Sequence, residues 1–296
     1  MEEAGVKPLP QNRFLRGTYL MIRRYLNHGV AIQSAALAFY LLFTIFPLMI
    51  FFSALLGLLH LDITEILEGI GRFLPASVVS LLELYLRYVQ QSPNIRLMLF
   101  GLFFSIYFPM RAANTLMRAV RTAYHLGPPR RAYQHMLRTF LYTVLLIVTI
   151  LLTVVFMMVG NLALSYAVEN FGLPAQLALL WEKLRFPAVT ALMYFALHFL
   201  YAITQDVRQP WKNLFPGVLA ALGSWLLTSF LFSYYVENFA AYSLLYGSIG
   251  TVIVLMTWLY LSASILILGA ELNGTLISLR KERALPESEK NLSDPT

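Results

Sequence analysis

The chain has 296 residues, of which 58% are hydrophobic and 12% charged, and its net charge at pH 7 is +7. Soluble domains carry about twice that share of charged residues, so the composition excludes an ordinary soluble protein. The absence of cysteine excludes disulfides, thiolate metal sites and cysteine nucleophiles. The positive charge does not indicate nucleic-acid binding, because the basic residues flank long apolar stretches as they do in membrane proteins.

The first 34 residues precede the first long apolar stretch and contain several arginines. Between residues 12 and 26, apolar residues such as Phe14, Tyr19 and Ile22 alternate with basic ones, a pattern typical of an amphipathic helix at a membrane surface. The charged residues of this segment do not fit a cleavable signal peptide. We therefore expect residues 1–34 to be a cytoplasmic, interfacial segment.

Residues 35–280 contain six runs that predict membrane-crossing helices. The second run has only fourteen uncharged residues, about 21 Å of helix, so it can span a bilayer only if Arg111 lies within it. The sequence therefore predicts an all-α, polytopic membrane protein with a bundle of six transmembrane helices. The expected spans are residues 35–59, 96–111, 140–164, 186–204, 214–236 and 245–277.

Lysine and arginine are concentrated in the amino-terminal segment, the second and fourth loops and the tail, whereas acidic residues outnumber them on the other side. By the positive-inside rule, this asymmetry places both termini in the cytoplasm. The outer loop, residues 60–94, has apolar residues at helical spacing and is expected to be helical. Residues 281–296, rich in polar residues and proline, are expected to form a disordered cytoplasmic tail.

Polar side chains recur at helical spacing within several spans. Three interpretations remain open: hydrogen bonds that tighten the bundle, arginines that reach inner-leaflet phosphates, and lines that converge on a polar cavity. The snorkelling interpretation fits Arg118 and Arg121 better than Arg111. The candidate binding residues on these lines are Tyr107, Arg111, Asn114, Arg118, His198, Tyr201, Tyr260 and Glu271.

Arg111 and Glu271 are the two charges that favour a cavity, because either one alone is costly at membrane depth. Both lie toward the inner ends of their spans, so we hypothesise that they pair. Separate roles in one wet cavity are the alternative.

Motifs for catalysis are missing from the sequence. The five histidines are scattered and none lies beside an acid in a metal-ligand pattern. There is no phosphate-binding glycine loop and no nucleophile elbow. The sequence therefore predicts no metal site, no cofactor and no enzymatic activity.

Several short motifs resemble the YihY/BrkB family of bacterial inner-membrane proteins. They are the run from Ala35 to Tyr40 with Pro47, Pro216-Gly217, Tyr246 to Gly250, and Gly269 to Asn273. The resemblance covers nearly the whole chain and implies six spans, cytoplasmic termini and an inner-membrane location. Some family members were once labelled ribonuclease BN, others virulence factors, and some have been linked to transport of lipids or lipopolysaccharide precursors. The structural motif residues are Tyr40, Pro47, Pro109, Pro216, Gly217, Gly247, Gly250 and Asn273.

The ribonuclease label finds no support in the residues, because RNA hydrolysis needs a metal or an acid-base cluster. The leading hypothesis is binding or translocation of an anionic lipid or lipid-linked envelope precursor through a polar cavity. Arg111, Asn114 and Arg118 would engage a phosphate head group, and Glu271 would hold Arg111 in the empty state.

Two alternatives to lipid transport stay open. One is a proton-coupled carrier of small solutes, in which Glu271 and His198 exchange protons. The other is a non-transporting scaffold for envelope assembly. Membrane lipids with anionic head groups are the expected partners and nucleic acid is not, while a homo-oligomer or envelope-assembly proteins are left open.

Overall fold

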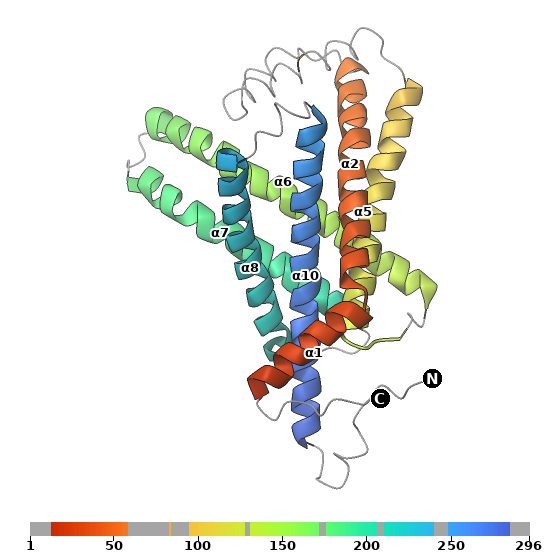
Figure 1. Ribbon diagram of the computed structural model, residues 1–296. Helices are drawn as coiled ribbons and strands as arrows, with labels where there is room; N and C mark the ends of the chain where they lie inside the picture. Colours follow the sequence, from red (N-terminus) through yellow and green to blue (C-terminus); the bar gives the residue numbers. More distant parts are fainter. Residues whose placement is uncertain are drawn as a thin grey trace. The chain divides into compact units, whose positions relative to one another are not determined.

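The chain folds into helices, which confirms the all-α prediction (Figure 1). The computed structural model describes residues 13–58, 83, 95–127, 131–171, 176–205, 210–239 and 248–284. The helices in these residues are α1 (Arg13–Asn27), α2 (Val30–Leu58), α5 (Ile95–Ala123), α6 (Ala132–Phe171), α7 (Gln176–Ile203), α8 (Trp211–Phe239) and α10 (Ser248–Ala284).

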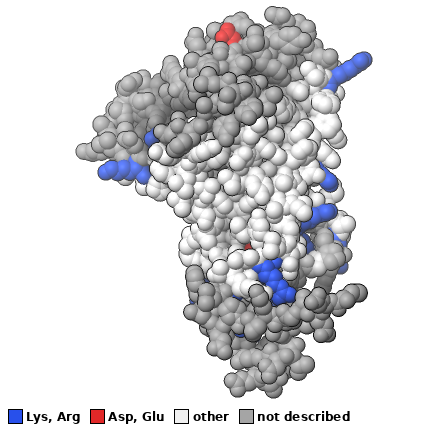
Figure 2. All heavy atoms as spheres, in the orientation of Figure 1, with Lys and Arg blue, Asp and Glu red and all other residues white. Residues whose placement is uncertain are grey.

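Five helices of the described part are long and apolar enough to cross a membrane, and they correspond to the expected first, second, fourth, fifth and sixth spans. α6 is 40 residues long and includes the expected third span, residues 140–164. On the face drawn in Figure 2, uncharged atoms cover most of the described surface. The polytopic helical membrane protein is thus confirmed. The membrane-length segments are Val30–Phe51, Ile95–Ala123, Lys183–Ile203, Trp211–Val236 and Val252–Lys281.

Some predictions fall on residues that the structure does not describe. The helical outer loop, residues 60–94, lies outside the described residues apart from Glu83, and so does Gly247. α10 continues to Ala284, so residues 281–284 are helical and the expected tail begins later than residue 281. The rest of the tail lies outside the described residues.

The chain divides into two compact units. Unit 1 comprises Met1–Ala38, Asn114–Tyr142 and Met193–Thr296, and unit 2 comprises Phe39–Ala113 and Thr143–Leu192. α1, α8 and α10 belong to unit 1 alone, whereas α2, α5, α6 and α7 each contribute one end to it.

In unit 1, α8 and α10 run antiparallel and in close contact, since small residues line their crossing (Figure 1). A Cβ atom on Gly217 would collide with the carbonyl oxygen of Gly269. Asn273 fixes the crossing, because its Nδ2 donates to the Leu214 carbonyl at 2.8 Å and its Oδ1 accepts from the Gly217 N–H at 2.7 Å. The motif residues Gly217, which follows Pro216, and Asn273 therefore hold α8 and α10 together.

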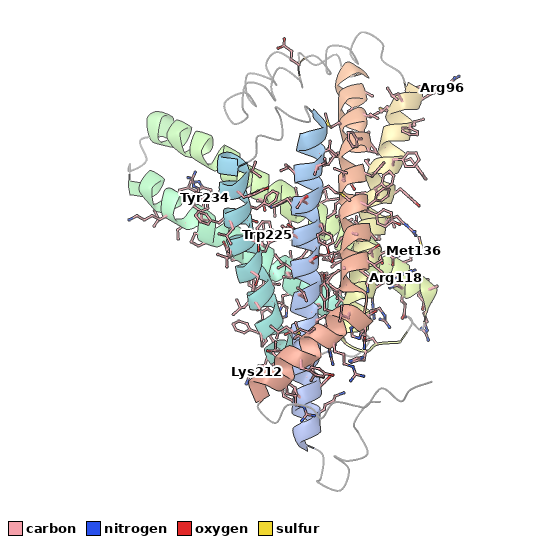
Figure 3. The ribbon with its side chains drawn as sticks, in the orientation of Figure 1. Arg96, Arg118, Met136, Lys212, Trp225 and Tyr234 are labelled. Carbon is pink, nitrogen blue, oxygen red and sulfur yellow. The ribbon has the colours of Figure 1, made fainter. Side chains whose placement is uncertain are left out.

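Side chains from α7 and α8 add further bonds to α10 within unit 1. The indole Nε1 of Trp225 donates to Ser262 Oγ at 3.0 Å (Figure 3). The hydroxyl of Tyr201, which is fully buried, donates to the Leu266 carbonyl at 2.6 Å. For Tyr201, the structure thus supports the interpretation that polar stripes tighten the bundle.

Unit 2 has its own glycine crossing, between α2 and α5. A Cβ atom on Gly101 would lie 2.7 Å from the backbone N of Phe51 and 3.0 Å from the Pro47 carbonyl oxygen. Pro47 and Pro109 both lie inside continuous helices. Aromatic rings extend the contact between the two helices, since the ring centroids of Phe108 on α5 and Phe43 on α2 are 5.8 Å apart.

Candidate functional site

Glu271 lies on α10 with a side chain that is fully buried in unit 1. A carboxylate taken out of water is stable only when an opposite charge and hydrogen bonds compensate it. The neighbouring α10 residues Ala270, Asn273 and Thr275 are also buried. The partners of the carboxylate therefore have to come from another segment.

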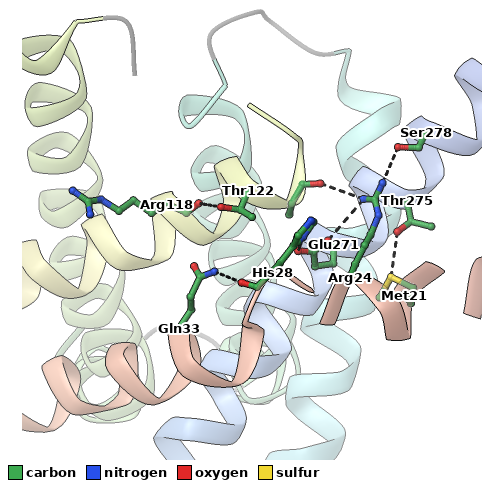
Figure 4. A network of polar contacts seen from close by, with 10 residues as sticks. Met21, Arg24, His28, Gln33, Arg118, Thr122, Glu271, Thr275 and Ser278 are labelled. Carbon is green, nitrogen blue, oxygen red and sulfur yellow. Dashed lines mark hydrogen bonds and ion pairs between the residues drawn. The ribbon is translucent and has the colours of Figure 1, made fainter. Parts of the chain in front are cut away.

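They come from α1 and the turn that follows it (Figure 4). His28 Nδ1 lies 2.6 Å from Glu271 Oε1, and Arg24 Nη1 lies 3.8 Å from Oε2. Arg24 and Glu271 thus form an ion pair that is too long for a hydrogen bond. Oε2 of Glu271 has no hydrogen-bond partner among the described residues. Arg24, His28 and Glu271 form what we term the Glu271 cluster.

Arg24 is held by more than its ion pair. Its Nη1 donates to the Ala123 carbonyl at 3.3 Å, and its Nη2 donates to Ser278 Oγ at 2.8 Å (Figure 4). Gly274 makes room for this contact, because a Cβ atom there would collide with the Ala123 carbonyl oxygen. One guanidinium thus joins α1, the end of α5 and α10.

The local sequence explains why Arg24 and His28 reach α10 together. Four residues apart, they share one face of the helix. The N–H of His28 donates to the Arg24 carbonyl at 2.9 Å and closes the last turn of α1. Gly29 then adopts a left-handed φ of +61°, which glycine tolerates without strain, and the chain turns into α2. Gln33 Nε2 donates back to the His28 carbonyl at 2.7 Å.

His125, at the end of α5, lies beside the cluster, with its ring centroid 5.4 Å from that of His28. Burial lowers the pKa of His125, and the charges of Arg24 and His28 lower it further. Burial also lowers the pKa of Arg24, while the Glu271 carboxylate opposes that shift. His125 therefore favours its neutral form, because any positive charge on it would face Arg24.

The outer face of α1 is apolar. Ile22 is 59% exposed and Leu26 is 68% exposed, whereas Arg24 is only 8% exposed. Arg24 therefore faces the protein, whereas Ile22 and Leu26 point away from it. An amphipathic α1 is confirmed as a helix, and its place at the membrane surface stays a prediction.

A pocket of about 170 Å³ lies next to the cluster, between α1, α8 and α10. Its walls include Met21, Ser224, Ile265, Leu268 and Leu272, so it is largely apolar. The Met21 sulfur also accepts a bond from Thr275 Oγ1 at 3.5 Å, which anchors α1 at the pocket edge. The polar cavity expected from the sequence stays a prediction, since this pocket is of a different kind.

Arg111, in contrast, is an exposed residue of unit 2. Its Nη2 lies 3.4 Å from the Tyr40 hydroxyl, and its guanidinium lies 5.6 Å from the centroid of the same ring. Tyr107, on the same helix, is 41% exposed. The predicted pair of Arg111 with Glu271 stays a prediction, but Arg24 and His28 already supply the compensation that motivated it.

The other residues predicted on α5 have separate surroundings in unit 1. Asn114 Oδ1 lies 2.8 Å from His135 Nε2, and Arg118 is exposed. Arg121 does not snorkel, as one interpretation expected, because it is buried and donates to the carbonyls of Gly127 at 2.6 Å and Thr204 at 3.0 Å. It closes the end of α5 onto α7.

The remaining candidates also have local partners. His198 is buried and its ring stacks on Trp211 with centroids 3.7 Å apart. Tyr260 forms a hydrogen bond with Tyr25 of α1, which raises the pKa of Tyr25. The contact that the structure gives Glu271 is thus with His28 rather than His198.

Sequence reasoning missed Arg24, His28 and His125. The search for histidines beside acids in a metal-ligand pattern could not find the contact of His28 with Glu271, because the two residues are 243 positions apart. One available signal was the spacing of Arg24 and His28 on a helix whose opposite face carries Ile22 and Leu26. Among the described residues, no group of three or more histidine, aspartate or glutamate side chains is placed to hold a metal ion.

Comparison with known proteins identifies the family. Residues 21–292 match the family model described as Virulence factor BrkB. The chain belongs to the BrkB family. The resemblance seen in the motifs is therefore confirmed, and it extends from α1 beyond α10.

Two curated relatives are similar to most of the chain, and one of them is named a membrane protein. The "Putative ribonuclease-like protein YfkH" of Bacillus subtilis is 30% identical over 267 residues, which cover 90% of this chain and 96% of that protein. A "UPF0761 membrane protein" of Chromohalobacter salexigens is 28% identical over 276 residues, 90% of this chain but only 64% of the relative, so the chain spans less than two thirds of that protein. No solved structure matches.

Proposed function

We propose that this BrkB-family membrane protein binds or translocates an anionic lipid or a lipid-linked envelope precursor. The observation that best supports this function is the apolar pocket between α1, α8 and α10, since exposed basic side chains follow about two helical turns away along α8 and α10. Acyl chains favour an apolar pocket, and phosphate favours arginine and lysine. The pocket therefore has the chemistry of a lipid-chain site.

The spacing along α8 and α10 suits a lipid. Arg280 Nη1 donates to Asn213 Oδ1 at 2.7 Å, which places it beside Lys212, and both basic residues are exposed. Lys212 precedes the pocket residue Ala220 by eight positions, and Arg280 follows Leu272 by eight, which is about 12 Å of helix in each case. A lipid whose head-group phosphate lies at Lys212 and Arg280 could thus place its acyl chain in the pocket. Arg111 and Arg118 remain further head-group candidates on α5.

A pocket-filling substitution tests this proposal. Native mass spectrometry of the purified parent should detect bound anionic lipid, and vesicles of phosphatidylglycerol should be favoured over vesicles of phosphatidylcholine. Ser224→Phe places a ring in the pocket and should reduce bound lipid about tenfold, because it removes apolar volume worth roughly 1.4 kcal/mol or more. Leu226→Phe, an exposed α8 position outside the pocket wall, is the control.

Two outcomes would contradict the lipid proposal. One is a parent that retains no lipid at all, and the other is a Ser224→Phe variant that retains as much as Leu226→Phe. Changing Lys212 and Arg280 together to alanine should weaken the preference for phosphatidylglycerol while leaving chain binding intact. A liposome assay of lipid translocation then separates binding from transport.

We also propose that the protein lies in a bacterial inner membrane with both termini in the cytoplasm. Support comes from the distribution of lysine and arginine among the loops. A reporter fused after Gln90 should be periplasmic and one fused after Pro129 cytoplasmic. The reverse pair of results would overturn this orientation.

The alternatives give different results in the same experiments. A proton-coupled carrier of small solutes would depend on a pH gradient, and a scaffold would lose its cellular role only when residues 61–93 are disrupted. The proposed function is not enzymatic, and RNA hydrolysis by the purified protein, abolished by Glu271→Gln, would contradict that part of it. A homo-oligomer and envelope-assembly partners are compatible with each outcome.

A further inference from the structure

The charge of the Glu271 cluster depends on one imidazole. Arg24 and Glu271 balance each other, but the Arg24 guanidinium hydrogen-bonds to Ala123 and Ser278 and reaches the carboxylate only at 3.8 Å. The hydrogen bond that Glu271 receives comes from His28, at 2.6 Å. The cluster is therefore neutral overall when His28 is neutral and carries one positive charge when His28 is protonated.

The geometry also locates the proton. Because Nδ1 faces a carboxylate oxygen at 2.6 Å, Nδ1 carries the hydrogen and Nε2 is the position that takes up a second proton from water. The resulting imidazolium would convert a neutral hydrogen bond to Glu271 into a charge-assisted one. Protonation of His28 thus strengthens the bond that joins the end of α1 to α10.

The surroundings restrict the proton to this site. Among the described residues, the His28 ring contacts Glu271 on α10 and His125 at the end of α5. Arg24 on α1 lies at the other oxygen of the same carboxylate, and the Gln33 amide on α2 bonds the His28 backbone carbonyl. His125 favours its neutral form, so it does not compete for the proton. From α7, the Tyr201 hydroxyl donates to the Leu266 carbonyl.

We propose that Arg24, His28 and Glu271 form a buried proton-binding site, and that the bound proton fastens α1 over the pocket between α1, α8 and α10. Met21 of α1 forms one wall of that pocket and contacts Thr275. Release of the proton loosens α1 and opens the pocket toward the membrane surface. The effect on lipid access rests on the proposed function, whereas the proton site rests on the cluster alone.

Single-cysteine labelling tests the proton site, since the parent chain contains no cysteine. Thr275→Cys puts a thiol at a position that is 1% exposed and covered by α1, and Asn27→Cys puts a reference thiol at an exposed position of the same helix end. The ratio of their rates with a water-soluble maleimide removes the common effect of pH on thiol reactivity. That ratio reports how often α1 lifts from α10.

We expect the ratio to be about fivefold higher at about pH 8 than at about pH 5.5, the range in which imidazoles titrate. The sign follows from the charge-assisted bond, which is present at acidic pH and lost as the pH rises. In His28→Gln the ratio should no longer depend on pH, whereas His198→Gln, which alters a buried histidine stacked on Trp211, should keep the fivefold change.

A ratio in the parent that is the same at both pH values would overturn the proposal, and so would a pH dependence that survives in His28→Gln. If His28→Gln does not fold, Glu271→Gln provides the second test and should also remove the pH dependence. The labelling needs no lipid transport. A pH-dependent ratio in a protein that binds no lipid would therefore keep the proton site and reject the proposed function.

Discussion

Glu271 and Arg111 are both charges within helices of membrane length, yet their surroundings in the two units differ. Glu271 in unit 1 is fully buried and lies next to two basic side chains from α1. Arg111 in unit 2 is exposed and lies against Tyr40. The position of a charge within an apolar run therefore does not determine whether its side chain is buried.

The same difference separates the energetic roles of the two charges. Removing a partner from a buried ion leaves an uncompensated charge, whereas removing an exposed arginine leaves no charge stranded. Four sets of substitutions test these charges, the helix crossings and the polar contacts around them, in order of decreasing expected effect. For each variant, the measured quantity is the change in the free energy of unfolding in detergent.

Arg24→Ala should have the largest effect. It leaves Glu271 without its permanent cation and should cost about 3–5 kcal/mol of unfolding free energy. Arg111→Ala, the matched change in unit 2, should cost less than about 1 kcal/mol. Thermal and denaturant unfolding followed by tryptophan fluorescence gives both values.

The control for Arg24→Ala is its combination with Glu271→Gln. Because the stranded charge is removed as well, the double variant should regain much of the lost stability. If Arg24→Ala and Arg111→Ala lower the free energy of unfolding equally, water reaches both charges. That result would contradict the difference between the two units.

Gly217→Ala tests the helix crossing in unit 1 and should cost about 1–3 kcal/mol, because its Cβ would collide with the Gly269 carbonyl. Gly101→Ala tests the crossing in unit 2 and should cost a similar amount. Gly223→Ala is the control on α8, since a Cβ there meets nothing within 4 Å, and it should be neutral or stabilising. A Gly217→Ala variant as stable as Gly223→Ala would contradict the close crossing.

Asn273→Ala removes two hydrogen bonds to the backbone of α8 and should cost about 1–2 kcal/mol. Asn114→Ala removes one bond to a His135 side chain that is only partly buried, and its cost should be about 0.5 kcal/mol. The same unfolding measurement compares them. If the Asn273 amide fixes the register of α8 and α10, Asn273→Ala should lose more unfolding free energy than Asn114→Ala. Equal losses in the two variants would reject that role.

Tyr40→Phe should have the smallest effect, below about 0.5 kcal/mol, because the 3.4 Å contact with Arg111 is long and exposed. Tyr40→Leu also removes the ring and should cost roughly 0.5–1 kcal/mol more. A loss of several kcal/mol in Tyr40→Phe would mean that Arg111 depends on the hydroxyl as Glu271 depends on Arg24.

The spans could be predicted from the sequence because their apolar length is a local property. The fourteen uncharged residues before Arg111 required that arginine to lie inside the helix, and α5 contains it. The run from Gly269 to Asn273 could be recognised as a motif. Its physical reasons, a close helix crossing and an amide bonded to the backbone of α8, depend on residues more than fifty positions away.

The partners of Glu271 could not be predicted in the same way. The alternation of apolar and basic residues predicts α1 as an amphipathic helix, and that pattern agrees with the exposure of Ile22 and Leu26. It does not predict that Arg24 and His28 lie against Glu271. Arg121 likewise reads as a snorkelling residue until the Gly127 and Thr204 carbonyls are seen to surround its guanidinium. Long-range hydrogen bonds leave no periodic trace in the sequence.

The distance along the chain between His28 and Glu271 has a consequence for biosynthesis. At about 5–20 residues per second, the 243 intervening residues take roughly 10–50 s to synthesise. During that interval α1 is complete but its acidic partner does not yet exist, so its apolar face can rest on the membrane while Arg24 and His28 stay hydrated. Docking of α1 is thus a late event, and it reports that α10 has been made and inserted.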